Sequence, residues 1–280
     1  MTQAAARTAE ALLPLAGICI FFFASMAVFG ARCAAFGRPR TSYIESRQAS
    51  ALWKWFMEWW VWLWGPVERA CLALRISPNT ITVASTFATA GAAWLIIDGS
   101  LAIGGWAYLF ASSLDLVDGR VARAQGTATA AGAFLDSTLD RLAELLVFAG
   151  LAIHFRATPT LYAALAAAAA SVLVSYARAR GEALGASGEA RSGGMQRAER
   201  VVLTGLPCAL SPLAEHFFGP GSGELAAGSA LGVLAFVTLL TAARRSLAIW
   251  RTLGGPSPDP TALGNVRWLE NARKRQRLGR

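Results

Sequence analysis

Four aspartates lie in two closely spaced pairs between residues 115 and 140, Asp115 with Asp118 and Asp136 with Asp140. Because an α-helix turns about 100° per residue, each pair shares one helix face. If a short turn near Gly126 makes the two helices antiparallel, the four carboxylates face one another and repel strongly unless a cation neutralises them. Histidine and cysteine are absent from the stretch, so its hard oxygen ligands suit Mg²⁺ or Mn²⁺ better than zinc.

Small residues and an arginine accompany these aspartates. Gly119, Ala122 and Gly132 leave room for a bulky ligand or for a neighbouring helix. Arg123, one turn beyond Asp118, is placed to pair with a phosphate. Together these features indicate a diphosphate site, in which metal ions bridge phosphates and stabilise charge during a displacement. The plainer interpretation is a set of interfacial salt bridges from the aspartates to Arg120, Arg123 and Arg141.

The composition is that of an integral membrane protein. Hydrophobic residues make up 55% of the 280 residues and charged residues only 15%, whereas a soluble domain carries about 25% charged residues. The net charge of +9 gathers in short connections and in the C-terminal tail. Positive charge placed in this way is expected to meet anionic lipid headgroups. Nucleic acid is the weaker alternative, because no soluble domain that could bind it is expected. Neither a zinc site nor a disulfide framework is expected from the scattered cysteines Cys19, Cys33, Cys71 and Cys208.

Seven apolar stretches are each long enough to cross a bilayer as a helix of about 20 residues. They cover residues 11–31, 79–97, 101–123, 131–153, 159–180, 198–218 and 225–248. A signal peptide is the competing interpretation of the first stretch, but the arginines that follow it favour an uncleaved span. Arginines gather in alternate connections, so the N-terminus is expected outside and the C-terminus inside. The aspartates then lie on the cytoplasmic face of the cell inner membrane.

Residues 41–76 mix tryptophan with charged residues. Tryptophan concentrates at the membrane–water interface, so this segment is expected to form an amphipathic helix on the cytoplasmic surface, with a bend at Gly65-Pro66. A lipid-facing girdle at the start of the next span is the alternative. The expected fold is therefore an all-α integral membrane protein. Its parts are an N-terminal span in residues 1–40, the tryptophan-rich helix in 41–76, a six-helix domain in 77–250 and a basic tail in 251–280.

The acidic stretch resembles the signature of the CDP-alcohol phosphotransferase family, D-x-x-D-G-x-x-A-R-(x)8-G-x-x-x-D-x-x-x-D. Every fixed position is matched, by Asp115, Asp118, Gly119, Ala122, Arg123, Gly132, Asp136 and Asp140. Coincidence is a poor explanation for so many matches. The resemblance covers about residues 66–250 and implies a membrane enzyme of phospholipid synthesis. Such enzymes cleave the diphosphate of a CDP-linked lipid or alcohol, transfer the phospho-alcohol part to an acceptor hydroxyl and release CMP.

The resemblance also implies roles for individual residues. The four aspartates would hold a centre of two ions, Mg²⁺ or Mn²⁺, and Asp140 would in addition act as the general base on the acceptor hydroxyl. Contacts to the nucleotide and the diphosphate would come from Gly119, Ala122, Arg123, Asn79 and Thr82.

Arginines on the same expected membrane face indicate the acceptor. At the ends of the fourth and fifth core spans these are Arg178, Arg180, Arg197 and Arg200. The positive-inside rule and pairing with glutamates explain some of them, but an all-arginine set favours bidentate recognition of phosphate. The S-Y-x-x-A-R and R-A-E-R segments resemble those of actinobacterial phosphatidylinositol phosphate synthases, whose acceptor is inositol phosphate. Glycerol 3-phosphate, used by phosphatidylglycerophosphate synthases, is the runner-up, and serine or free inositol is third.

Two other classes of function are compatible with the sequence. A cation transporter would use the aspartates as an ion path, although transport favours acidic residues near mid-membrane on broken helices. A membrane scaffold would recruit partners through the basic tail. The enzyme interpretation instead predicts CDP-diacylglycerol as donor, a small polar acceptor, contact with the lipid bilayer and, by resemblance to the family, a homodimer.

Overall fold

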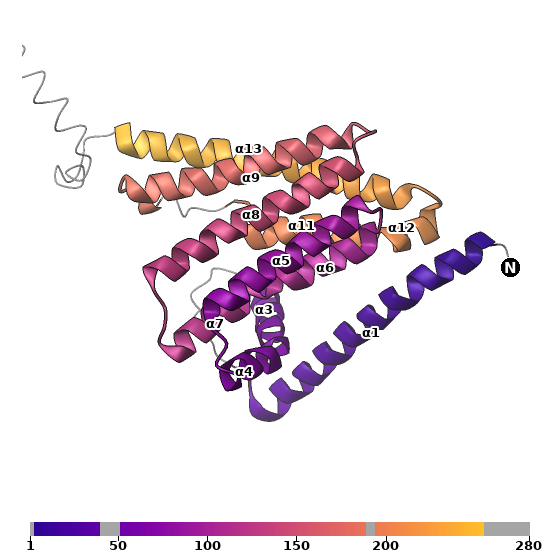
Figure 1. Cartoon of the computed structure of the whole chain (residues 1–280), viewed down its shortest axis with the longest axis horizontal. Helices are drawn as coiled ribbons and strands as arrows, with labels where there is room; N and C mark the ends of the chain where they lie inside the picture. Colours follow the sequence, from indigo (N-terminus) through magenta and orange to yellow (C-terminus); the bar gives the residue numbers. More distant parts are fainter. Residues whose placement is uncertain (1–2, 40–50, 189–193, 255–280) are drawn as a thin grey trace, which may run out of the picture.

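The computed structural model describes residues 3–39, 51–188 and 194–254, and the regular structure in these ranges is entirely helical (Figure 1). The helices are α1 (Gln3–Phe36), α3 (Ala51–Leu63), α4 (Gly65–Ala73), α5 (Pro78–Ile97), α6 (Leu101–Ser113), α7 (Asp115–Gln125), α8 (Ala130–His154), α9 (Thr160–Ala183), α11 (Arg197–Ala209), α12 (Ser211–Phe218) and α13 (Ser222–Gly254). The expected all-α class is therefore confirmed. The predicted basic tail beyond residue 254 and residues 40–50 of the tryptophan-rich segment lie outside the described ranges.

Four helices in the described ranges are long and apolar enough to cross a membrane, and a fifth span results if α11 and α12, bent by 46°, count as one. The four are Ala16–Phe36 within α1, Pro78–Ile97, Thr160–Ala183 and Ser222–Gly254. Two of the seven predicted spans, over residues 101–123 and 131–153, are not among these helices. Residues 101–123 and 131–153 are helical, but both segments carry charge. α8 is 25 residues long and contains Asp136, Asp140, Arg141 and Glu144.

The span predicted over residues 101–123 is two helices, α6 and α7, which meet at Leu114. There the Leu114 N–H donates to the Ala111 carbonyl, and the Leu114 carbonyl accepts from Val117, each three residues away. This bonding tightens the turn directly before the first aspartate of the site. α7 ends at Gly126, whose left-handed backbone, with φ of 66°, favours glycine. The turn predicted near Gly126 is confirmed.

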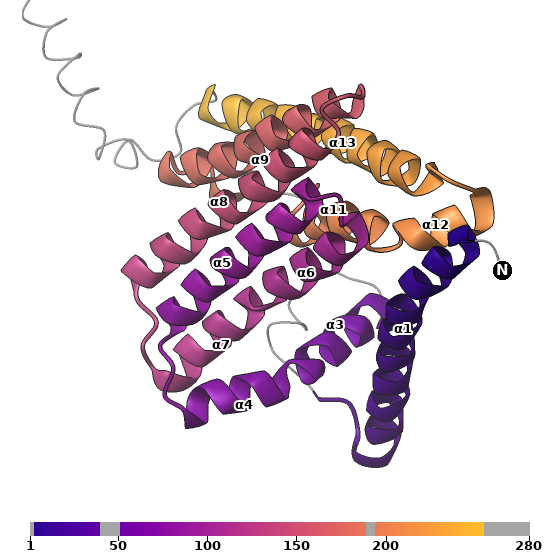
Figure 2. The ribbon, with the colours of Figure 1, turned by 45° about the vertical axis from the view of Figure 1, so that its right-hand side comes forward.

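Six helices form a closed ring in which each packs on two neighbours, in the order α5, α6, α11, α13, α9, α8 and back to α5 (Figures 1 and 2). Glycine permits the close approaches. A Cβ built on Gly105 of α6 would lie 2.7 Å from the Gly205 carbonyl oxygen of α11. One built on Gly150 of α8 would lie 2.9 Å from the Ala93 carbonyl oxygen of α5. Small residues bring helices together in this way in membrane bundles.

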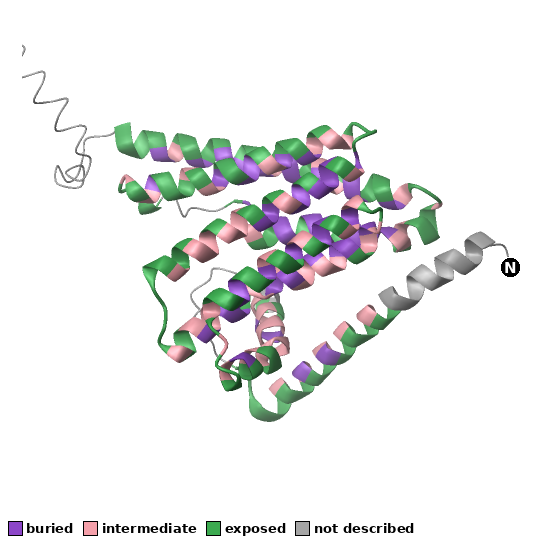
Figure 3. Ribbon diagram, in the orientation of Figure 1, coloured by how far each residue is buried: buried purple, intermediate pink, exposed green. Residues whose placement is uncertain are grey.

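α1 stands beside this ring, touching α12 near its N-terminal end and α3 between Phe22 and Phe29 (Figures 1 and 2). The Phe22 ring of α1 stacks on Trp60 of α3 and on Phe110 of α6, with ring centroids 5.8 and 6.1 Å apart. Trp59 of α3 is 2% exposed, and its Nε1 donates to Ser25 Oγ at 3.2 Å. The rest of the described surface of α1 is largely exposed and apolar (Figure 3), which suits a helix that meets lipid.

The tryptophan-rich segment folds as two helices, α3 and α4, that meet at the bend predicted from Gly65-Pro66. Its tryptophans pack on the phenylalanines of α1, as Trp55 and Trp62 do on Phe29, with ring centroids 5.5 Å apart in each case. The composition of the segment predicts that these rings lie at the membrane surface or in a lipid-facing girdle. Their contacts show that they also attach α1 to the rest of the molecule. The placement of α3 at a membrane surface stays a prediction.

Candidate active site

Hydroxyl groups of α5 hold the two aspartates of α7. Thr82 Oγ1 donates to Asp118 Oδ2 at 2.6 Å, and Ser85 Oγ donates to Asp115 Oδ1 at 3.0 Å. Asp118 is only 4% exposed, and a buried carboxylate needs such a partner because its loss of solvation is costly. Thr82 is among the predicted residues. Ser85 is not, although its position one turn later signals the same helix face.

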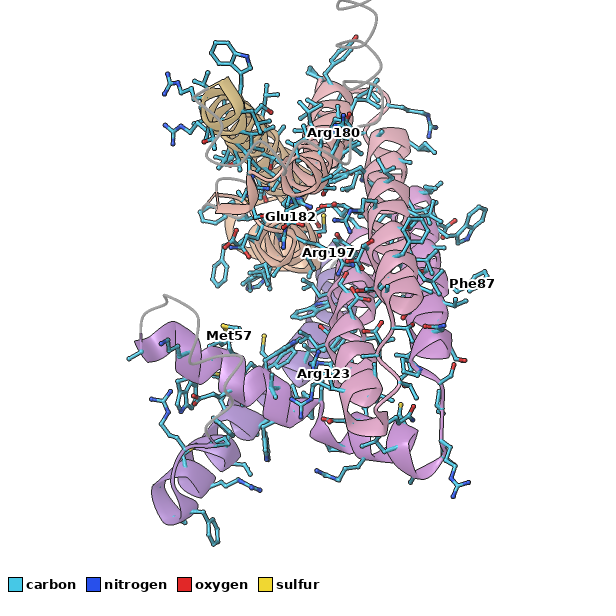
Figure 4. The ribbon with its side chains drawn as sticks, turned by 90° about the vertical axis from the view of Figure 1, so that its left-hand side faces the viewer. Met57, Phe87, Arg123, Arg180, Glu182 and Arg197 are labelled. Carbon is cyan, nitrogen blue, oxygen red and sulfur yellow. The ribbon has the colours of Figure 1, made fainter. Side chains whose placement is uncertain are left out.

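Arg197 of α11 joins the two pairs of aspartates. Its Nη1 forms an ion pair with Asp115 of α7, and its Nη2 lies 3.0 Å from Asp140 Oδ1 of α8. Arg141 is a more distant neighbour, with Nη1 3.9 Å from Asp140 Oδ2. Figure 4 shows Arg197 where α11 faces α7 and α8. One guanidinium therefore balances a carboxylate from each pair.

Arg200 lies one turn after Arg197 but in a different environment. Its Nε and Nη2 form a bidentate pair with Glu144 of α8 at 2.6 and 2.9 Å, and both side chains are buried. Its Nη1 donates to the Met195 carbonyl oxygen at 3.3 Å. The expectation that Arg200 binds the acceptor phosphate needs correction, because its side chain is only 3% exposed and all three of its nitrogens bond within the protein, whereas the Arg197 side chain is 27% exposed. Arg200 instead holds α11 against α8.

The other two arginines assigned to the acceptor lie near the end of α9, and both are exposed. Arg178 Nε pairs with Glu182 Oε1 at 3.2 Å, one turn away on the same helix. In Figure 4, Arg180, Glu182 and Arg197 follow one another down the face in view. An exposed pair of this kind is worth only about 0.3–0.5 kcal/mol, so Arg178 can exchange its glutamate for a phosphate at little cost.

The residues assigned to the nucleotide lie on α7 and at the start of α5. Arg123 is exposed and folds back over Gly119, where a built Cβ would lie 3.4 Å from Arg123 Nη1. A Cβ on Gly132, at the start of α8, would lie 3.5 Å from Asn79 Oδ1. Ala122 is half-buried on α7. Glycine at these two positions leaves space beside the polar ends of Arg123 and Asn79.

α4 fixes another side of α7. Glu68 of α4 pairs with Arg120 of α7 at 2.5 Å, and Gln125 Nε2 donates to the Ile76 carbonyl oxygen at 3.1 Å. Arg120 is thus engaged with a glutamate of a different helix. Of the three arginines in the salt-bridge interpretation, Arg120 therefore does not serve the aspartates, whereas Arg141 does lie near Asp140.

The donor set of the site fits a hard divalent cation in chemistry. It consists of aspartate carboxylates with threonine and serine hydroxyls beside them, and all are oxygen donors. Within the described residues, no three histidine, cysteine, aspartate or glutamate side chains are gathered closely enough to hold a metal ion. In this arrangement the guanidinium of Arg197 bridges Asp115 and Asp140. The guanidinium of Arg197 therefore supplies positive charge between α7 and α8.

The match to a known protein family covers the ring of helices. Residues 75–250 match the family model described as CDP-alcohol phosphatidyltransferase. The chain belongs to the CDP-alcohol phosphatidyltransferase family. It is therefore a phosphotransferase, a membrane enzyme of phospholipid synthesis that moves a phosphatidyl group from a CDP-linked donor to an alcohol. α1 and α3 lie outside the matched range.

Individual relatives of this family member are phosphatidylinositol phosphate synthases. That of Mycobacterium tuberculosis is 34% identical over 196 residues, which cover 68% of this chain and 86% of the relative. A crystal structure of the M. tuberculosis enzyme with CDP-DAG bound matches with a TM-score of 0.60 at 29% identity, covering 69% of this chain and 98% of that one. A second, in complex with manganese and citrate, matches with a TM-score of 0.58 at 30% identity, covering 71% and 90%.

Proposed function

We propose that this enzyme transfers the phosphatidyl group of CDP-diacylglycerol to a hydroxyl of a phosphorylated polyol, such as inositol phosphate, and releases CMP. The observation that carries the proposal is the position of Arg197. Its guanidinium, a group suited to phosphate, reaches from α11 to Asp115 and Asp140. The relatives support both substrates, because they are phosphatidylinositol phosphate synthases and one was solved with CDP-DAG bound.

In this proposal the four aspartates hold two divalent ions, Mg²⁺ or Mn²⁺. Support comes from the oxygen donor set and from the relative solved with manganese. When bound, such ions neutralise the charge of the diphosphate and polarise the bond that breaks. The contacts to nucleotide and diphosphate are assigned to Gly119, Ala122, Arg123, Asn79 and Thr82.

The protein's own residues then orient the acceptor and move a proton. Arg197, with the exposed Arg178 and Arg180, binds the acceptor phosphate and directs the hydroxyl to Asp140. Asp140 takes the hydroxyl proton as the acceptor oxygen bonds to the phosphorus of the phosphatidyl group. The bond from that phosphorus to the oxygen of CMP breaks, and CMP leaves with the electron pair.

An acceptor panel tests the proposed function directly. Purified protein is incubated with CDP-diacylglycerol, Mg²⁺ or Mn²⁺ and one acceptor at a time: inositol phosphate, glycerol 3-phosphate, serine or inositol. CMP release should be fastest with inositol phosphate, and EDTA should stop it until divalent ions are restored. If glycerol 3-phosphate is fastest, the enzyme is instead a phosphatidylglycerophosphate synthase. If serine or free inositol is fastest, the assignment of the arginines to an acceptor phosphate is wrong.

The two non-enzymatic hypotheses have separate tests. A cation transporter would pass Mg²⁺ into liposomes without any CDP-alcohol, and we expect no such flux. A scaffold would depend on its basic tail, whereas the enzyme should not. Deleting residues 255–280 should therefore leave the rate of CMP release unchanged, and a large loss of that rate would argue that the tail takes part in the reaction.

We also infer that the site faces the cytoplasm and that the N-terminus lies outside the inner membrane. The protein is further expected to be a homodimer and to bind no nucleic acid. The first two rest on the distribution of arginines along the chain. The homodimer is expected from the family, and sedimentation of the detergent-solubilised protein tests it. The division into residues 1–40, 41–76, 77–250 and 251–280 is likewise a proposal.

A further inference from the structure

α8 and α11 are joined by two ion pairs, one helical turn apart. Asp140 meets Arg197 at 3.0 Å, and Glu144 meets Arg200 at 2.6 Å. The spacing is four residues on α8 and three on α11, so both pairs lie along one line between the helices. The side chains of Asp140 and Arg197 are 15% and 27% exposed, but those of Glu144 and Arg200 are 5% and 3% exposed. The Glu144–Arg200 pair is therefore buried more deeply than the Asp140–Arg197 pair.

Arg200 also fixes the backbone that leads into α11. Its Nη1 donates to the Met195 carbonyl oxygen at 3.3 Å, while the Met195 N–H donates to Thr241 Oγ1 of α13 at 3.2 Å. At Gly194 the backbone has φ of +104°, and a Cβ there would lie 2.5 Å from Thr241 Cγ2. The segment directly before Arg197 is thus held from α8 and from α13.

We propose that Glu144 and Arg200 are positioning residues for the transfer reaction, which fix the register of α11 against α8 so that Arg197 reaches the aspartates. Stability alone explains such a pair poorly, because the lost solvation of two buried charges offsets their attraction. Two parallel hydrogen bonds between rigid groups, however, define distance and angle closely. This inference rests on the proposed function in one respect, namely that Arg197 binds the acceptor.

A double-mutant cycle tests the coupling of Glu144 to Arg197. Glu144→Gln keeps the shape of the side chain but removes its charge, and it should raise the acceptor KM and lower kcat/KM by as much as about 10²-fold. The KM for CDP-diacylglycerol should not change. Because Glu144 acts through Arg197, adding E144Q to Arg197→Gln should cost nothing further. If the two losses multiply instead, the proposal is overturned.

A matched control lies at the other end of α8. Glu224 of α13 pairs with His154 of α8 at 3.7 Å, so Glu224→Gln makes the same chemical change in another contact of the same helix. We expect wild-type KM values for both substrates in E224Q. An acceptor KM raised as much as in E144Q would mean that any loosening of α8 has this effect, which would overturn a specific role for Glu144.

A second variant separates positioning from folding if E144Q proves unstable. The double replacement Glu144→Met with Arg200→Met removes both charges, and well-packed apolar pairs often preserve stability at such sites. It should unfold in detergent near the wild-type temperature and still show the raised acceptor KM. Wild-type kinetics from this folded variant would overturn the proposal. All assays use whichever acceptor the wild type prefers, so an unexpected acceptor would count against the proposed function alone.

Discussion

A guanidinium between two carboxylates sets the electrostatic character of the site at the scale of single residues. Arg197 pairs with Asp115 from one helix and with Asp140 from another, while Thr82 donates to Asp118 and Ser85 donates to Asp115. A charged side chain at the centre of a bilayer costs about 2.5–3.5 kcal/mol on insertion scales. Asp115, Asp118 and Asp140 are therefore tolerated here because each has a cation or a hydroxyl as partner.

Replacing Asp136 or Asp140 of α8 should strongly lower the rate of CMP release without unfolding the protein. Asp140→Asn takes away the proposed base, and a loss of about 10²–10⁴-fold in CMP release is expected from the usual contribution of general-base catalysis. Asp136→Asn should also abolish measurable release, because it removes a proposed metal ligand. The measurement is CMP release from CDP-diacylglycerol at saturating Mg²⁺.

Asp98→Asn is the matched control for these two variants. Asp98 is an exposed residue at the C-terminal end of α5, so D98N should keep the wild-type rate. A wild-type rate in either D136N or D140N would refute the proposed mechanism.

At the scale of helices, the close packing of α6 on α11 at Gly105 determines the position of α7. A Cβ on Gly105 of α6 would lie 2.5 Å from the Ala209 backbone nitrogen, so Gly105→Ala must push α6 away from α11. Overpacking of this kind costs about 1–3 kcal/mol. Because α6 leads directly into α7, G105A should lower both the unfolding temperature in detergent and the rate of CMP release.

Gly91→Ala provides the comparison for G105A. Gly91 is an exposed residue of α5, and nothing lies within 4 Å of a Cβ built there. G91A should unfold at or slightly above the wild-type temperature, because alanine is the better helix former by about 1 kcal/mol. Equal effects of G91A and G105A would show that packing at Gly105 does not control the position of α7.

The helices differ in how far the sequence could predict them. Apolar runs and glycine or proline at the turns, such as Gly126 and Gly65, give local signals that need no knowledge of the fold. The break at Leu114 has no such signal, since neither glycine nor proline lies beside it. The spacing of the aspartates likewise predicts the candidate site, but the partner of Arg200 could not be predicted. Glu144 is 56 residues away, and only the ring of helices brings the two together.

At the scale of the whole molecule, the orientation in the membrane can be tested with the two ends of α8. With a rise of about 1.5 Å per residue, this helix is longer than the hydrocarbon core of about 30 Å, so we expect its ends to emerge on opposite sides of the membrane. Ala128 precedes α8 and Ala157 follows it, and both are exposed. In a variant lacking the native cysteines, Ala128→Cys should react with an impermeant thiol reagent only from the cytoplasmic side.

Ala157→Cys should react only from the outer side. Inside-out and right-side-out vesicles distinguish the two sides. The reverse pattern would place the aspartates outside, and labelling of both positions from one side would show that α8 does not span the membrane.

The acidic residues of α8 also bear on how the chain is inserted during synthesis. α8 leaves the ribosome with Asp140 and Glu144 before Arg197 and Arg200 have been made. Each unpaired charge near the middle of a helix opposes entry into lipid by about 2.5–3.5 kcal/mol on the translocon scale. We therefore expect α8 to wait at the translocon until α11 supplies both arginines, and chains truncated before residue 197 to leave α8 outside the bilayer.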